Sequence, residues 1–324
     1  MFWHFASVLV LSAAGGAAVA QAQSSGSYPS RPVRIVVPQS PGASTDLTAR
    51  LLAQKLSPVL GQSVIVDNRP GAGSLVGTEV VAKATPDGHT LLVVASSLTL
   101  NPVLRKNLGY DPVSDFAPIT QVSSFANMIT VHPTVPVKTV QDLIALAKSK
   151  PGSLNYASSG NGTPYHMAGE LFKSMAGVDL VHIPHKGSDQ ARAAVLGGQV
   201  QMMFDGVPTM AASARAGKVK ALATSGAKRS AVTPDVPTLS EAGVPGYESG
   251  IWLGLMAPAK TPRPVLEKLN MEVNKLLNSA EVRDNWGKQG TMTMGMSIEQ
   301  FEKFLREEIV KWAKVVKISG AKAD

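Results

Sequence analysis

Short apolar runs that suit β-strands alternate with helix-like segments along most of this chain. Residues 35–37 and 91–94 are apolar at every position, so both faces of these strands must be buried. Such strands, separated by helices, are typical of mostly parallel sheets with helices on both sides, and the pattern predicts an α/β fold. The expected strands are residues 33–37, 63–66, 90–95, 118–122, 128–131, 154–157, 180–183, 200–204, 219–224 and 253–256.

Four of the expected helices carry start signals. Thr139 and Ser297 each precede an acidic or amide residue by three positions, the spacing of a capping box. Thr163-Pro164 and Thr261-Pro262 each place a proline at the first helical position, where its missing N–H costs nothing. Gly177 is the expected stop of the helix that Pro164 opens.

Two long segments, residues 116–132 and 249–258, are predicted to cross between domains. The first holds two apolar runs split by Ser123-Ser124-Phe125. A second domain, residues 126–249, would then be inserted into a first domain made of residues 24–125 and 250–324. Two crossings of this kind create a hinge and a cleft.

The N-terminal segment predicts export. Residues 5–20 are uncharged, apolar or small, and end in Ala-x-Ala sites, so residues 1–23 are expected to be a cleaved signal peptide. The chain has no cysteine, which excludes disulfides, thiolate metal sites and cysteine nucleophiles. The net charge of +8 comes from dispersed basic residues without interleaved aromatic residues, so nucleic acid is not an expected partner.

Two small-residue loops lie between a strand's carboxyl end and a helix N-terminus: the first loop, residues 38–46, and the second loop, residues 158–163. Free backbone N–H groups and the helix dipole make such places anion sites. One loop from each domain could hold the two ends of a dicarboxylate. Asp205, at the end of an apolar strand, is expected either in the cleft or in an ordinary strand-end turn.

The sequence does not match the known motifs of catalytic and cofactor sites, so no catalytic residue, metal or cofactor is predicted. Residues 157–160 lack the Gly-x-Ser-x-Gly elbow, although His166 and Asp205 could complete a triad. Residues 71–77 have one residue too many for a dinucleotide fingerprint and suit helix–strand packing better. An exported serine hydrolase that uses Ser158 or Ser159 remains the alternative.

Co-linear motifs along the mature chain resemble the Bug family, the periplasmic solute receptors of tripartite tricarboxylate transporters. The matching segments are Val36-Val37-Pro38, Pro41-Gly42, Ser44-Thr45-Asp46, Val66-Asp67-Asn68-Arg69-Pro70-Gly71-Ala72-Gly73, Pro86-Asp87-Gly88, Asn155-Tyr156-Ala157-Ser158-Ser159-Gly160-Asn161-Gly162-Thr163, Pro184-His185-Lys186-Gly187, Phe204-Asp205, Pro234-Asp235-Val236-Pro237-Thr238-Leu239-Ser240-Glu241-Ala242-Gly243 and Ala257-Pro258.

The resemblance implies a periplasmic, type II-like Venus-flytrap binding protein without catalysis. It also implies a small carboxylate ligand, membrane transporter subunits as partners, and a monomer. A receptor that feeds a membrane sensor is the other alternative. The implied ligand-binding residues are Gln39, Pro41, Gly42, Ala43, Ser44, Thr45 and Asp46 in the first loop, Ser158, Ser159, Gly160, Gly162 and Thr163 in the second, and His166 and Asp205 nearby.

Several positions depart from the pattern of the family. Gln39 stands where an aromatic residue is usual, Ser40 replaces a proline, and Ala43 replaces a glycine. His89 and His185 stand where tyrosine is common. Gln39 makes the expected pocket mouth more polar, so the ligand of a relative cannot be assumed here.

Overall fold

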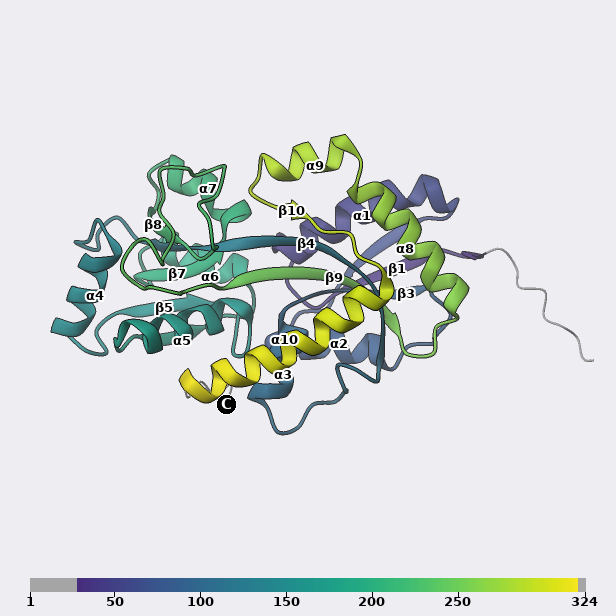
Figure 1. The fold of residues 1–324 in the computed structure, drawn as a ribbon, viewed down its shortest axis with the longest axis horizontal. Coiled ribbons are helices and arrows are strands. Elements are labelled where there is room, and N and C mark those ends of the chain that lie inside the picture. Colours follow the sequence, from purple (N-terminus) through teal and green to yellow (C-terminus); the bar gives the residue numbers. More distant parts are fainter. Residues whose placement is uncertain (1–27, 320–324) are drawn as a thin grey trace, which may run out of the picture.

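The computed structural model describes residues 28–319, so the predicted signal peptide lies outside the described residues. Strands and helices alternate as the sequence predicts (Figure 1). The first stretch holds β1 (Val33–Val37), α1 (Ser44–Leu60), β2 (Val64–Asn68), a 3-10 turn (Ala72–Ser74), α2 (Leu75–Ala82), β3 (Thr90–Ala95) and α3 (Ser97–Leu104). The middle holds β4 (Phe116–Val131), α4 (Val140–Ser149), β5 (Asn155–Ser158), α5 (Pro164–Ala176), β6 (Val181–Pro184), α6 (Ser188–Leu196), β7 (Met202–Gly206), α7 (Val207–Arg215) and β8 (Lys220–Thr224). The last stretch holds β9 (Gly250–Pro258), α8 (Arg263–Leu277), α9 (Ala280–Gly287), β10 (Met292–Thr293) and α10 (Ile298–Ser319).

The strands form one continuous sheet in the order β2-β1-β3-β9-β4-β7-β5-β6, with β8 and β10 paired to β4. Strands β2, β1 and β3 run parallel to one another, and so do β6, β5 and β7. Each antiparallel pairing among the described residues involves β4 or β9. The α/β architecture with parallel strands on either side of two crossover strands is therefore confirmed.

Strand β4 corrects one detail of the prediction. Instead of two strands split at residues 123–125, it is a single strand of 16 residues. Its middle residues Ser123, Ser124 and Phe125 pair with residues 251–253 of β9. This pairing satisfies the backbone groups of the polar interruption, and two register shifts in the ladder absorb its irregularity.

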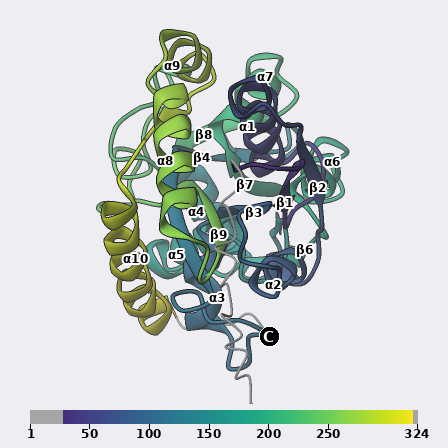
Figure 2. The same cartoon turned by 90° about the vertical axis from the view of Figure 1, so that its right-hand side faces the viewer.

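Separate hydrophobic cores lie at the two ends of the sheet. Toward the first end, α1, α8 and α9 cover one face and α2, α3 and α10 cover the other (Figures 1 and 2). Toward the other end, α4 and α5 pack on one face, and α6 and α7 pack on the opposite face. On this basis we propose that residues 28–125 and 250–319 form one lobe, the first lobe, and residues 126–249 the second lobe.

The helix signals are largely confirmed. Thr139 forms the predicted capping box with Asp142, and α5 ends before Gly177, whose φ is +62°. Two starts differ in detail. Thr163 precedes Pro164 as predicted, but its hydroxyl donates to the carbonyl of Gly160 instead of capping the helix. Helix α8 begins at Arg263, one residue later than predicted, because Pro262 has an extended backbone.

Gly77 has the packing role that the sequence favoured over a dinucleotide fingerprint. A Cβ atom at this position would lie 2.7 Å from the Cα atom of Pro38, so α2 can approach β1 only with glycine there. No helix within residues 28–319 combines the length and hydropathy that a membrane crossing requires.

Candidate functional site

Loops from the two proposed lobes face each other where parallel strands end and helices begin. A Cβ atom built on Gly187, just before α6, would lie 2.9 Å from the Cβ atom of Ser40 in the first loop. In the second loop, the carbonyl of Asn161 accepts a hydrogen bond from Arg105 of the first lobe at 3.3 Å. The first and second loops are therefore both part of the contact between the lobes.

In the first loop, Asp46 organises the backbone. Its carboxylate accepts hydrogen bonds from Gly42 N at 2.9 Å, from Arg50 Nε at 2.9 Å and from Asn68 Nδ2 at 3.0 Å. Burial by itself would raise the pKa of Asp46, but these hydrogen bonds outweigh it and hold the pKa below its usual value. Gly42 has a φ of +82°, a conformation that side chains disfavour. Asp46 thus fixes the turn that opens α1.

Other residues of the first loop divide between interior and surface. Thr45 Oγ1 donates to Gln39 Oε1 at 2.6 Å, so the amide nitrogen is the polar group that Gln39 can offer a ligand. Gln39, Ala43 and Thr45 are buried, whereas Pro41 and Gly42 lie on the exposed side of the turn.

The second loop holds itself together with its own hydroxyl groups. Ser158 Oγ accepts from Gly160 N at 3.1 Å and lies 2.6 Å from His182 Nε2. Thr163 Oγ1 donates to the Gly160 carbonyl at 2.7 Å. Ser159 Oγ is buried and has no hydrogen-bond partner among the described residues. The hydroxyls of Ser158 and Thr163 therefore shape the loop, and Ser159 is the hydroxyl left to contact a ligand.

A stack of three rings, two of them buried and that of His182 half-buried, supports the second loop from behind. The ring of His182 stacks on His166 at 4.1 Å and on Tyr156 at 4.9 Å, measured between centroids. His166 Nδ1 accepts a hydrogen bond from Gly162 N at 3.2 Å. Burial lowers the pKa of His166 to about 4, and burial together with neighbouring positive groups lowers the pKa of His182 to about 3. Both rings are therefore neutral at pH 7.

The triad considered from the sequence does not assemble. Ser158 pairs with His182 and not with His166, and Asp205 is used elsewhere. The physical reason is that His166 faces the backbone of the second loop, where its ring nitrogen accepts from Gly162. Ser158 is also fully buried, so its hydroxyl has no open side for an ester to approach.

Asp205 forms an ion pair inside the second lobe. Its carboxylate is fully buried, lies 2.8 Å from Arg192 Nε, and accepts from Gly206 N at 2.8 Å. The second terminal nitrogen of Arg192, Nη2, is buried with no partner among the described residues. Asp205 also interacts with the hydroxyl of Tyr165, which connects this ion pair to the contact between the lobes.

Tyr165 and Arg192 are candidate site residues that the sequence did not single out. A tyrosine in the first turn of an amphipathic helix usually belongs to a core, and an arginine four residues into α6 usually faces solvent. Packing within the second lobe brings both side chains to Asp205, and contact with the first lobe places Tyr165 beside the candidate site.

A small cavity of about 10 Å³ separates the lobes beside these residues. Gln39, Ser44 and Thr45 line it from the first lobe, and Pro164 and Tyr165 line it from the second. The remaining lining residues are Ala95, Phe125, Ile251 and Leu253. A space of this size holds about one water molecule, so the structure represents a closed arrangement of the lobes.

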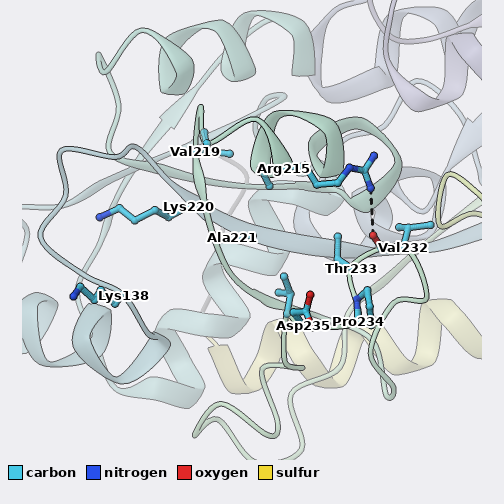
Figure 3. Close-up of a pocket in the computed structure, with 12 residues that line it drawn as sticks. Lys138, Arg215, Val219, Lys220, Ala221, Val232, Thr233, Pro234 and Asp235 are labelled. Atoms are coloured by element: carbon cyan, nitrogen blue, oxygen red, sulfur yellow. Dashed lines mark hydrogen bonds between the residues drawn. The ribbon is translucent and has the colours of Figure 1, made fainter.

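A larger cavity, about 740 Å³, lies within the second lobe between α7, β8 and residues 232–236 (Figure 3). Two of its three cationic side chains are used by the fold, and the third, Lys138, stands alone at one side. Lys220 Nζ donates to the carbonyls of Val135 and Val137, and Arg215 donates to the carbonyl of Val232. This cavity therefore lacks the convergent polar groups that characterise a ligand site.

Potential metal ligands do not gather within residues 28–319, where no group of three or more His, Asp or Glu side chains could hold an ion. The polar groups of the interlobe site are instead hydroxyls, amides and helix N-termini, which suit an organic anion.

The family model described as tripartite tricarboxylate transporter family receptor matches residues 48–321. The protein BugT of Bordetella pertussis is 35% identical over 308 residues, which cover 94% of each chain. Among solved structures, MatC from Rhodopseudomonas palustris with bound malate is 33% identical with a TM-score of 0.83, covering 89% of this chain and 100% of that one. Rpa4515 of R. palustris with adipate is 35% identical with a TM-score of 0.88, covering 91% of this chain and 99% of that one.

Proposed function

Because the chain belongs to the tripartite tricarboxylate transporter receptor family, we propose that it captures a small organic carboxylate between its two lobes in the periplasm. One structural observation carries this proposal: residues at the starts of α1 and α5, one helix from each lobe, line the same small interlobe cavity. Similar proteins with bound malate and adipate make a carboxylate the favoured ligand class.

The helix N-termini supply the physical basis for anion binding. The first backbone N–H groups of α1 and α5 have no partner within their helices, and both dipoles present their positive ends to the cavity. A carboxylate placed there accepts hydrogen bonds without needing a cationic side chain. We assign ligand contact to Gln39, Ser44, Thr45 and Ser159 and to the backbone of these two helix starts.

The remaining predicted residues are assigned a positioning role, because they have no polar side chain or because their polar groups are already hydrogen-bonded within the protein. Asp46 holds the shape of the first loop by accepting a hydrogen bond from the backbone N–H of Gly42. These positioning residues are Pro41, Gly42, Ala43 and Asp46 in the first loop, Ser158, Gly160, Gly162 and Thr163 in the second, and His166 and Asp205 behind them.

Ligand entry requires the lobes to separate, because a cavity of about 10 Å³ is too small for a dicarboxylate. Strands β4 and β9 connect the lobes, so they form the hinge of this motion. The closed form would then present a different surface to the membrane subunits of the transporter. Export by cleavage of residues 1–23 and a monomeric receptor complete the proposal.

A serine hydrolase is disfavoured by the environment of Ser158, which is fully buried and hydrogen-bonded within its loop. Ser159 has a free hydroxyl, but the described residues place no histidine in hydrogen-bonding contact with it. The receptor function therefore agrees better with the geometry.

A ligand screen tests the proposal. The mature protein, refolded to remove any co-purified ligand, would be melted with straight-chain monocarboxylates, dicarboxylates, tricarboxylates and acidic amino acids. A ligand at 100 times its Kd adds about 2.7 kcal/mol to the free energy of unfolding, which raises the Tm visibly. Stabilisation by one class, without turnover of the compound, supports a receptor. Consumption of an ester by the wild type would instead favour the hydrolase.

A further inference from the structure

Tyr165 of the second lobe packs into a small hydrophobic cluster between the two lobes. It lies in the first turn of α5, yet only 4% of it is exposed. Its ring packs in a cluster with Ala95 of β3, Leu253 and Ile251 of β9, and Phe125 of β4. The second lobe thus places one ring against the first lobe and against both crossover strands.

The polar end of Tyr165 bridges the two sides of the proposed site. Its hydroxyl lies near Ser44, the first residue of α1, whose Oγ is buried with no hydrogen-bond partner among the described residues, and near Asp205, which Arg192 holds in place. Burial raises the pKa of this phenol above its usual value, so the group remains protonated and able to donate.

The position of Tyr165 limits the space available to a ligand. The ring lines the small cavity together with Ser44, Thr45 and Gln39, the residues that face the carboxylate site from the first lobe. A carboxylate held at the N-terminus of α1 would extend its carbon chain toward this ring. The ring can yield some space by moving with its lobe, but it remains the wall that the chain meets.

We propose that Tyr165 is a specificity-determining residue whose ring sets the maximum chain length of the acid and whose hydroxyl hydrogen-bonds its distal polar group. This inference rests on the proposed carboxylate-receptor function. The distal group lies on the side of the second lobe, where the phenol approaches the ion pair of Asp205 with Arg192, whose Nη2 is buried without a partner among the described residues. Short dicarboxylates fit between the helix N-termini and the ring, whereas longer ones collide with it.

The test compares affinities for straight-chain mono- and dicarboxylates of four to seven carbons, measured by calorimetry. The variants are Tyr165→Ala, which removes the wall, Tyr165→Leu, which keeps an apolar contact, and Tyr165→Phe, which removes only the hydroxyl. Met167→Ala is the matched control, because Met167 lies on the same helix and also packs between the lobes, against Leu100 and Trp312, without lining the cavity.

The wild type is expected to prefer the shorter dicarboxylates. Tyr165→Ala should shift the ratio of long-chain to short-chain affinity by about tenfold or more, as pockets that differ by one or two methylene groups do. Tyr165→Leu should shift it in the same direction, and Tyr165→Phe should weaken dicarboxylates more than monocarboxylates of equal length. Met167→Ala should leave the ratio unchanged.

Different results would overturn the role of Tyr165 and the carboxylate-receptor function on which it rests. If the wild type binds these acids and the order of chain lengths is the same in Tyr165→Ala and Tyr165→Leu, the role of Tyr165 is overturned while the receptor function stands. An equal shift in Met167→Ala also overturns it, because the effect then comes from a looser lobe contact. If neither the wild type nor any folded variant binds any acid of this series or of the wider screen described above, the carboxylate-receptor function itself is overturned.

Discussion

Phe125 of β4 and Ile251 of β9 lie directly opposite each other in the antiparallel ladder that joins the two lobes. They are 126 positions apart in the sequence (251 minus 125), and the sequence places each of them in a separate crossover. Both side chains are buried beside Tyr165. The proposed hinge is therefore a hydrogen-bonded pair of strands with the proposed ligand site packed against it, so we expect changes at the site to alter the packing of the hinge.

A covalent link between the lobes should block ligand entry. Ser40→Cys with Gly187→Cys places two thiols across the lobe contact, where the Cβ atoms would be 2.9 Å apart, close enough for a disulfide after a small adjustment. Because the chain has no cysteine, no other disulfide can form. The oxidised variant should not bind an added carboxylate, and dithiothreitol should restore binding. Equally fast association in both redox states would contradict an opening motion.

Gly42 should be essential for the geometry of the first loop. Gly42→Leu forces a side chain into a φ of +82° and disturbs the N–H that donates to Asp46, so we expect affinity to fall at least about tenfold. Gly61→Leu is a matched control, since Gly61 also has a positive φ and open space but ends α1 at its far end. Calorimetry on both variants, with Tm as the folding check, decides the point. Equal losses of affinity would mean that Gly42 acts only through stability.

Ser158→Ala should reduce both stability and binding. The change leaves Gly160 N and His182 without their hydroxyl partner in a buried place, which costs about 1–3 kcal/mol of unfolding free energy. Urea unfolding measures this loss. Ser153→Ala removes an exposed hydroxyl bond to the Lys150 carbonyl and should change stability by no more than about 0.5 kcal/mol. A Ser158→Ala protein as stable as the wild type would argue against the internal role of this hydroxyl.

Stability should fall as the pH drops below the ordinary pKa of histidine. The unfolded chain takes up protons on His166 and His182 near pH 6.5, whereas the folded protein resists them until about pH 4 and about pH 3. Below pH 6.5 the unfolded state therefore binds more protons, and stability is lost as the pH falls toward 3, by on the order of 3 kcal/mol for each ring. Above pH 6.5 these two groups should contribute no pH dependence.

Urea titrations at several pH values between 7.5 and 4 check this expectation. His166→Gln should remove part of the slope, because the amide cannot titrate. The control His132→Gln changes a half-buried histidine whose ring bonds only Thr134, in its own turn. A slope that is the same in His166→Gln and the wild type would rule out His166 as its source.

Much of this protein follows from local sequence. Continuous apolar strands such as residues 91–94 can be stable only between two layers of helices, and this requirement gave the α/β architecture. The first and second loops could be located because a strand end followed by small residues and a helix start is a local pattern. The start of α4 at Thr139 was predictable for the same reason, since a capping box needs only four consecutive residues.

The tertiary structure decided what depends on contacts between distant segments. The pairing of Phe125 with Ile251 made one strand of two predicted runs, because β9 satisfies the backbone of residues 123–125. The pairing of β6 with β5 places His182 beside Ser158, and the packing of α6 against β7 places Arg192 beside Asp205. Tyr165 is a core residue by its local pattern and becomes a wall of the candidate site because the first lobe packs against it. A sequence encodes such a site only through the whole fold, since no local pattern carries the distance between two lobes.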